Sequence, residues 1–361
     1  MPIANVPTST FSPRARLLAG LAALLGAALV VATPGVADAA TTRNRADAGA
    51  GWLGRQLEDN AVTTQFGPSY GATADVVLAL SAAGVGRGTA RGATRFLKAH
   101  VLDYTGGGDP AEFYAGSFAK LLVVAAARRT NPRSFGSSDR ANLIAQLKAL
   151  ECGGKRRTCD PADRGRFSDI SQFGDFSNTI TQSLALIALE RTTATNPSPA
   201  AVRFLIDQQC DNGAFPEVFG ADTCAGSVDG TGFAVQALTT VGSPAAAEAA
   251  ADAGTWLAKK QHANGSFTGN AVRNTNSTAL AAQAFEALGR DTKATKARQF
   301  IRGLQATCGA PKALRGSVRY SRADAGDRVL ATSQAVPALA GVTLGEVSRT
   351  GSTRGLPRLS C

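Results

Sequence analysis

The feature that most constrains the fold of this chain is a repeated unit of two helices joined by a glycine turn. In the clearest copy, residues 204–238, the first helix ends at Asn212-Gly213. Both of these residues tolerate the left-handed backbone that stops a helix. Asp229 or Thr231 can cap the second helix, and the next copy repeats the turn at Asn264-Gly265. The pattern predicts a chain built from helical hairpins.

An aromatic-leucine pair, or a close substitute, marks the first helix of six such units. The pairs lie 44, 50, 58, 52 and 44 residues apart, a spacing typical of helical-hairpin repeats. These helices are amphipathic: Phe300 and Ile301 fall on one face, while Lys296 and Arg302 face water. The pairs are Trp52-Leu53, Phe96-Leu97, Gln146-Leu147, Phe204-Leu205, Trp256-Leu257 and Phe300-Ile301.

The second helices are apolar nearly all round, as in segments 76–80, 121–125, 184–189 and 233–238. A helix that has no polar face toward solvent must be covered by other parts of the protein on every side. Six amphipathic helices and six apolar helices fit two concentric rings, with the apolar helices in the inner ring. The predicted fold is therefore all-α, an α/α toroid or (α/α)6 barrel of six helical hairpins.

No interior linker divides the chain, so one toroid domain is expected over residues 40–346. The insertion 152–176, rich in Gly, Arg and Asp, is expected to be a surface loop. The tail, residues 347–361, is rich in Ser, Thr, Arg and Gly and is expected to be loose except where Cys361 anchors it. The six units are residues 48–86, 90–131, 141–193, 199–243, 246–290 and 294–346.

The N-terminus has the pattern of a secretory signal. Arg14 and Arg16 precede an uncharged run, residues 17–31, and Ala37-Asp38-Ala39 has the small-x-small form that signal peptidase requires. We expect cleavage after Ala39 and secretion by the Sec route, since the two arginines are not adjacent as a twin-arginine signal requires. The alternative is that residues 1–39 remain as an anchor.

All six cysteines follow the signal segment, and an even number in an exported chain favours disulfides. The sequence alone allows 15 connectivities. Position in the loops favours Cys152 with Cys159, Cys210 with Cys224, and Cys308 with Cys361. The last pair would tie the tail to the last repeat.

The formal net charge of +11 favours acidic partners, such as cell-wall or surface polymers, anionic lipids or phosphorylated ligands. The Lys and Arg residues are scattered with little aromatic interleaving, so nucleic acid is not an expected partner. We expect a monomer. With two histidines and no close C-x-x-C spacing, we also expect no metal site and no cofactor.

Two short patterns recur in the repeats: a turn of the form Q-x-x-x-G-x-F and a helix start of the form D-x-T or a relative of it. The turns are Gln209, Gly213, Phe215 and Gln261, Gly265, Phe267; the helix starts are Asp229 with Thr231, Asn276 with Thr278, Ser177 with Thr179 and Gly71 with Thr73. This combination resembles the prenyltransferase and squalene-oxidase repeat of terpene cyclases, protein prenyltransferase β subunits and vitamin B12 carriers. The resemblance implies the toroid fold over the whole mature chain; the repeat itself is architectural.

The chain departs from the catalytic members of that group. It lacks the acidic D-x-D-D cluster with which such cyclases protonate their substrates, and Asp229 is the one carboxylate at a comparable helix start. A prenyltransferase zinc site cannot be assembled from His100 and His262. Aromatic residues, which stabilise carbocations in cyclase cavities, make up only 6% of the chain.

In a toroid the parallel inner helices gather their N-termini around one mouth, where their partial positive charges suit an anion. Gln236, Gln283 and Gln334 fall at corresponding positions of the last three inner helices and either bond to backbone or face a ligand. The candidate ligand-binding residues are Tyr70, Asp75, Tyr114, Asp175, Asn178, Asp222, Asp229, Gln236, Asn274, Asn276, Gln283, Asp327 and Gln334.

Two classes of function remain. The first is a non-catalytic exported protein that binds a small amphiphilic ligand, isoprenoid-like or corrinoid-like, in the centre of the toroid. The second is an enzyme, either a cyclase with Asp229 as proton donor or, by analogy of fold only, a toroid hydrolase or lyase acting on an acidic polysaccharide.

Overall fold

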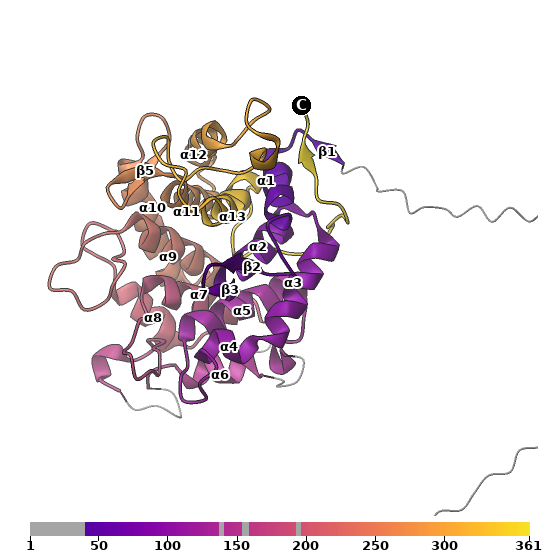
Figure 1. Cartoon of the computed structure of the whole chain (residues 1–361). Helices are drawn as coiled ribbons and strands as arrows, with labels where there is room; N and C mark the ends of the chain where they lie inside the picture. The colour runs from indigo at the N-terminus through magenta and orange to yellow at the C-terminus, as the bar shows by residue number, and fades with distance from the viewer. Residues whose placement is uncertain (1–39, 137–140, 154–158, 193–195) are drawn as a thin grey trace, which may run out of the picture. The chain divides into compact units, whose positions relative to one another are not determined.

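The dry second helices form a closed inner ring (Figure 1). A computed structural model describes residues 40–136, 141–153, 159–192 and 196–361, so the predicted signal segment and its cleavage site lie outside the described residues. Each inner helix packs against the next, and the last packs against the first. The inner helices are α2 (Tyr70–Ala83), α5 (Ala115–Arg128), α7 (Thr179–Glu190), α9 (Val228–Val241), α11 (Thr275–Ala287) and α13 (Arg328–Ala340).

The amphipathic first helices lie outside this ring, each packed on the inner helices by its apolar face. Trp52 and Trp256 are buried there, as are Leu53 and Leu257. A short helix, α4 (Val101–Gly106), is added before α5. The outer helices are α1 (Arg45–Gly54), α3 (Arg87–Ala99), α6 (Leu143–Ala149), α8 (Pro199–Asp207), α10 (Pro244–Lys260) and α12 (Asp291–Leu304). The predicted all-α toroid of six hairpins is confirmed.

The remaining elements are short. Two antiparallel hairpins, β2 (Val62–Thr64) with β3 (Gly67–Ser69) and β4 (Phe267–Gly269) with β5 (Val272–Asn274), lead into α2 and α11. Three 3-10 turns are η1 (Pro132–Ser134), η2 (Pro161–Asp163) and η3 (Lys312–Leu314). None of the helices that the structure describes is both long enough and apolar enough to cross a bilayer.

A buried side chain near the start of an inner helix fixes the register of that helix against the turn before it. The Thr231 hydroxyl accepts a hydrogen bond of 2.9 Å from the Phe215 backbone N–H. Thr73, Thr278 and Thr332 do the same for Val62, Phe267 and Val318. In the third repeat the acceptor is the amide oxygen of Gln182, at 2.9 Å from the Phe167 N.

This bond corrects the predicted alignment of the third repeat. The sequence pattern aligned Thr179 with Thr231, but Thr179 donates to the Pro216 carbonyl at 2.6 Å, and Gln182 occupies the place of Thr231. The pattern failed because a glutamine with a longer side chain replaces the threonine. The true register lies three residues further along α7.

Glutamine side chains join the turns of the last three repeats to the repeat that follows. The amide of Gln209 donates to the Gly213 carbonyl of its own turn and to Ala249 in α10, both at 2.9 Å. Gln261 bonds Gly265 and Lys293 in the same way. Gln305 bonds Gly316 and the Arg45 carbonyl at the start of α1, both at 2.9 Å. The last of these clamps joins the sixth repeat to the first and closes the outer ring.

The C-terminal tail is held along its length, so the expectation of a loose tail is wrong. Just before the tail, the Leu344 N–H donates to the Gln236 amide oxygen at 3.0 Å. Further along, Arg349 bonds the Ala127 carbonyl at the end of α5, and Thr353 bonds the Gly84 carbonyl at the end of α2. The tail ends as β6 (Arg358–Leu359), parallel to β1 (Thr41–Thr42). Composition alone missed this because backbone groups make most of these bonds.

All three disulfide pairs favoured by the sequence are confirmed. Cys152 pairs with Cys159 and Cys210 with Cys224, each within one repeat. Cys308, in the loop after α12, pairs with Cys361 and holds the last residue against the last repeat. The described residues contain no free cysteine.

The register bond gives a first prediction. Replacing Thr231 with Val keeps the shape of the side chain but leaves the buried Phe215 N–H without an acceptor. We expect the free energy of unfolding to fall by about 1–3 kcal/mol, measured by urea denaturation. The control is Thr255→Val in α10, whose exposed hydroxyl bonds Ala251. An equal loss in both variants would contradict a special role for the Thr231 bond.

The disulfides give a second prediction. Cys308 and Cys361 are 53 residues apart, whereas Cys152 and Cys159 are 7 apart. From the loop closed in the unfolded chain, replacing the long-range pair with Ser should cost about 4 kcal/mol and replacing the short-range pair about 2.5 kcal/mol. The urea midpoints of the two double variants measure the difference. A larger loss for the short-range pair would contradict the expectation that the longer closed loop contributes more stability.

Candidate functional site

The inner ring encloses a central cavity of about 200 Å³ to which all six inner helices contribute. The register bond decides which residues face it. Asp75, Phe233, Leu280 and Gln334 each follow the bonded threonine of their helix by two residues, and Leu184 follows Gln182 in the same way. Lys120 completes this layer from α5. The other lining residues are Leu78, Ile180, Gln283, Leu330, Ser333, Pro337 and Leu344.

Two charged side chains face each other in this wall. The Lys120 Nζ lies 3.0 Å from Asp75 Oδ1 and 3.2 Å from Oδ2. Burial by itself lowers the pKa of Lys120, but Asp75 and then Tyr104 outweigh it, so the pKa is raised above that of an ordinary lysine. Lys120 therefore stays charged, and the pair adds no net charge to the cavity.

Two amide oxygens in the cavity wall lack donors. Among the described residues, neither Gln283 Oε1 nor Gln334 Oε1 has a hydrogen-bond partner, although both atoms are buried. The Gln283 amide nitrogen donates to the Ala279 carbonyl at 3.3 Å. A buried acceptor without a donor costs about 1–3 kcal/mol, so both oxygens favour a ligand or water that donates to them.

The expected equivalence of the three glutamines holds for only two of them. Gln236 and Gln283 each follow the register threonine by five residues, whereas Gln334 follows Thr332 by two. Gln236 is fully buried and bonds the Leu344 N–H and the Gly232 carbonyl. It fastens the tail beneath the cavity, where Leu344 forms part of the wall.

Most of the other candidate residues lie at the mouth, the end of the ring where the inner helices begin. Asn178, Asn274 and Asp327 are N-caps whose side chains accept backbone N–H bonds from the first turns of α7, α11 and α13. Asp175 pairs with Arg166 at 2.8 Å and accepts from the Ser177 N–H. These four have structural partners and do not line the cavity.

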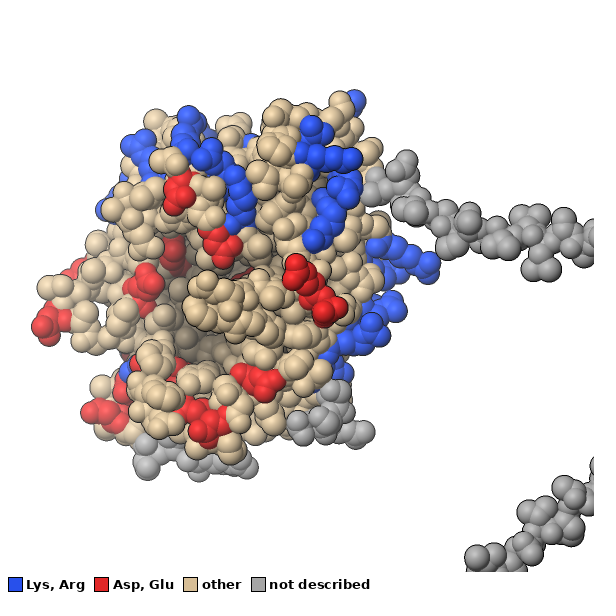
Figure 2. Space-filling view, in the orientation of Figure 1, with Lys and Arg blue, Asp and Glu red and all other residues tan. Residues whose placement is uncertain are grey.

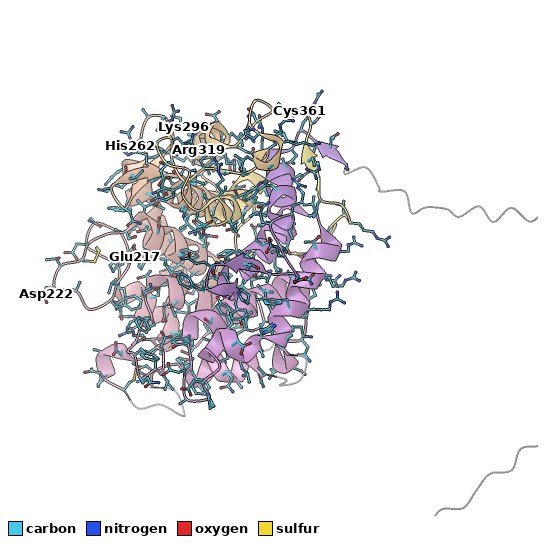
Figure 3. All side chains as sticks on the ribbon, viewed as in Figure 1. Glu217, Asp222, His262, Lys296, Arg319 and Cys361 are labelled. Carbon is cyan, nitrogen blue, oxygen red and sulfur yellow. A yellow bond between two sulfur atoms is a disulfide. The ribbon has the colours of Figure 1, made fainter. Side chains whose placement is uncertain are left out.

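The aromatic candidates are also engaged elsewhere. The Tyr114 hydroxyl donates to Glu112 at 2.9 Å. Tyr70 stacks on Phe96 and His100, with its hydroxyl 3.5 Å from an Asp103 oxygen. Asp222 is exposed on the loop before α9 and points away from the ring (Figure 3).

Asp229 and Asn276 occupy matching positions in the first turns of α9 and α11, two residues before the register threonines. Among the described residues, Asp229 Oδ1 and Asn276 Oδ1 have no hydrogen-bond partner. Burial raises the pKa of Asp229 above its ordinary value, the Ser277 side chain opposes this with a hydrogen bond, and Glu217 raises the pKa further. Neither residue lines the cavity.

The mouth is acidic. Figure 2 shows a hollow with several Asp and Glu side chains around it, while Lys and Arg side chains lie mainly along the upper and right edges of this view. The expectation that the helix N-termini would attract an anion here does not take these carboxylates into account. Large apolar side chains are also exposed on the loops that lead into the inner helices, among them Phe66, Phe173, Phe176 and Val218.

The sequence interpretation missed Lys120 and Tyr104. Lys120 is the one charged residue before the last turn of the apolar helix α5, and this isolation was a signal that could have identified it. Tyr104 belongs to the added helix α4, which the repeat pattern does not predict. Two larger hollows, of about 630 and 760 Å³, lie beside α8 on the outside and lack the six-helix wall of the central cavity.

Comparison with known proteins supports the fold. No family model matches the chain, and no curated protein matches it. A solved structure of a protein from Actinoplanes is 17% identical, with a TM-score of 0.51, and covers 82% of this chain and 98% of its own. The type II terpene cyclase MstE from Scytonema is 14% identical, with a TM-score of 0.58, covering 82% of this chain and 97% of its own.

A variant of MstE in complex with its substrate, geranylgeranyl dihydroxybenzoate, matches in the same way, with 15% identity, a TM-score of 0.57 and coverage of 82% and 96%. At these identities the similarity concerns the fold alone. The described chain has the α/α toroid fold found in type II terpene cyclases.

Proposed function

We propose that this protein binds a small amphiphilic ligand, isoprenoid-like and carrying a hydroxyl or amine, in its central cavity without transforming it. The observation that carries the proposal is an apolar cavity in which two buried amide oxygens, those of Gln283 and Gln334, lack donors. The apolar body of the ligand would lie against Leu184, Phe233 and Leu280. Its donor would bond one of the glutamines.

The size of the cavity favours a short isoprenoid over a corrinoid. About 200 Å³ is below the range of roughly 300–1,000 Å³ typical of drug-sized pockets. A short alcohol fits inside, while a longer chain must extend through the mouth, where Phe66 is 90% exposed. The isoprenoid substrate of MstE, a protein with the same fold, adds support by analogy.

The charges favour a neutral or cationic ligand. Asp75 and Lys120 neutralise each other in the cavity wall. Carboxylates surround the mouth (Figure 2), so a diphosphate would meet like charges on entry. An uncharged alcohol would not be repelled by the carboxylates at the mouth and needs no counter-charge in the cavity wall.

The cyclase alternative is less well supported. Phe233 is the one aromatic residue in the cavity wall, although carbocations require aromatic faces. Asp75, the one carboxylate there, is paired with Lys120, and Asp229 lies outside the wall. A polysaccharide hydrolase or lyase would require a pair of carboxylates facing one cleft, which the wall does not supply.

Export and a monomeric state are further parts of the proposal. Three disulfides are typical of proteins in oxidising compartments. The Gln305 clamp closes the ring within one chain, so a second copy is not needed to complete the cavity.

The cavity gives a third prediction. We expect the wild-type protein to bind geraniol about tenfold more tightly than the hydrocarbon myrcene, because one hydrogen bond to a buried acceptor is worth about 1.5 kcal/mol. Replacing Gln334 with Met should remove this preference while keeping the affinity for myrcene. Displacement of the fluorescent probe N-phenylnaphthylamine measures both affinities.

The control for this experiment is Gln146→Met, an exposed site on outer helix α6. The proposal is contradicted if the wild-type protein binds neither geraniol nor myrcene. Gas chromatography of the same mixtures, repeated with geranylgeraniol, tests for turnover; a cyclised product that Asp229→Asn abolishes would favour the cyclase.

Asp229 gives a fourth prediction. The pKa of Asp229 is higher in the folded protein than in the unfolded chain, so folding favours the protonated carboxyl. As the pH rises from the unfolded pKa through the folded pKa, ionisation of Asp229 therefore lowers the free energy of unfolding. The variant Asp229→Asn cannot ionise. The melting temperature of the variant minus that of the wild type should therefore increase from pH 4 to pH 7. A difference between the two proteins that does not change with pH would contradict the raised pKa.

A further inference from the structure

A second site of a different kind lies at the C-terminal end of the ring, the end where the inner helices stop. Here the tail crosses α5 and α2 through two backbone bonds, from Arg349 to Ala127 and from Thr353 to Gly84. This end lies one helix length, about 20 Å, from the mouth.

The central residue of this site is Arg128, in the last turn of α5. It is only 7% exposed. Within the described part of the chain, the one side-chain hydrogen bond of its guanidinium goes to the Ser81 hydroxyl, at 3.4 Å, and no carboxylate forms an ion pair with it. A buried cation normally has an anionic partner, since loss of hydration is costly.

The charged neighbours of Arg128 are all cations. Burial lowers the pKa of Arg128, and Arg349, Arg91 and Arg87 lower it further. Arg349 comes from the tail, and Arg91 and Arg87 come from α3. Three chain segments therefore bring four guanidinium groups together, and an anion would relieve their mutual repulsion.

A buried hydroxyl in the tail lies against the arginine cluster. Ser352 is fully buried, and among the described residues its hydroxyl has no hydrogen-bond partner. Its carbonyl accepts from the Arg87 guanidinium, which places Ser352 against the arginine cluster. A hydroxyl that can donate, beside several guanidinium groups, is a donor set suited to the oxygens of a phosphate.

We propose that Arg87, Arg91, Arg128 and Arg349 bind a phosphate group at the C-terminal end of the ring. Guanidinium groups present paired N–H donors that match phosphate oxygens, and they stay charged at physiological pH. The phosphate belongs either to a small soluble molecule or to a lipid headgroup. This site is separate from the central cavity and does not depend on the ligand bound there.

Fastening of the tail is the competing explanation for these arginines. Arg129 serves that role, since its guanidinium donates to the Thr350 hydroxyl at 2.9 Å, and Arg87 also bonds the Ser352 carbonyl. Arg91 and Arg349, however, are exposed and have no hydrogen bond from their side chains within the described residues. Their removal separates phosphate binding from attachment of the tail.

The experiment uses the whole mature protein and isothermal titration calorimetry with sodium phosphate, against sodium chloride at equal ionic strength. We expect wild-type protein to bind phosphate and the double variant Arg91→Gln, Arg349→Gln to bind at least about tenfold more weakly. The control is Arg95→Gln, an exposed arginine one turn along α3 that is not among the charged neighbours of Arg128. This control should bind phosphate like wild type.

A second arm identifies the source of the phosphate. Co-sedimentation with phosphatidylglycerol vesicles, but not with phosphatidylcholine vesicles, that is lost in the double variant indicates a lipid headgroup. Binding of inorganic phosphate without sedimentation indicates a soluble ligand. The proposal is overturned if wild type shows no phosphate binding beyond the chloride control, or if Arg95→Gln weakens binding as much as the double variant does.

Discussion

Three glutamine amides hold the last three junctions of the ring by bonding the backbone of two repeats at once. Gln209 and Gln261 each join the glycine of their own turn to a carbonyl of the next outer helix. Gln305 makes the same two bonds across the junction between the last repeat and the first. Because these carbonyls would otherwise be unpaired in a dry interior, each clamp sets the distance between neighbouring hairpins. These clamps fix three of the six junctions, and the packing of each inner helix on the next closes the circle.

The position of the cavity-lining residues follows from the repeated hydrogen bonds that set the register of the inner helices. Once the register bonds are set, one layer of six positions must face the centre, and three of these, Leu184, Phe233 and Leu280, are apolar. The polar exceptions are therefore informative. Asp75 and Lys120 satisfy each other, whereas Gln334 meets no donor among the described residues. In a dry ring, an unsatisfied amide is retained at a cost in stability, and binding of a ligand explains that cost better than packing does.

The repeat period and the apolar second helices were enough to predict the toroid and its six hairpins, and the position of the cysteines in loops was enough to favour all three disulfide pairs. They could not predict which candidate residues meet. Asn274 and Asp327 have the composition of a polar site but serve as helix caps. Gln236 and Gln283 share a register position, yet only Gln283 lines the cavity, because the Leu344 N–H bonds the Gln236 amide oxygen. Gln334 lies three residues earlier in register, close to one helical turn, and so it still faces the centre.

The distribution of charge follows from the direction of the inner helices. Six parallel helices place their partial positive charges at the mouth and their partial negative charges at the opposite end. Carboxylates at the mouth and Arg128 at the other end complement that field, although Arg328 and Arg319 also lie at the mouth. The two proposed ligands differ in the same sense: an uncharged amphiphile would enter at the mouth, and a phosphate would bind at the arginine end. The direction of the inner helices would then separate the two ligands by charge.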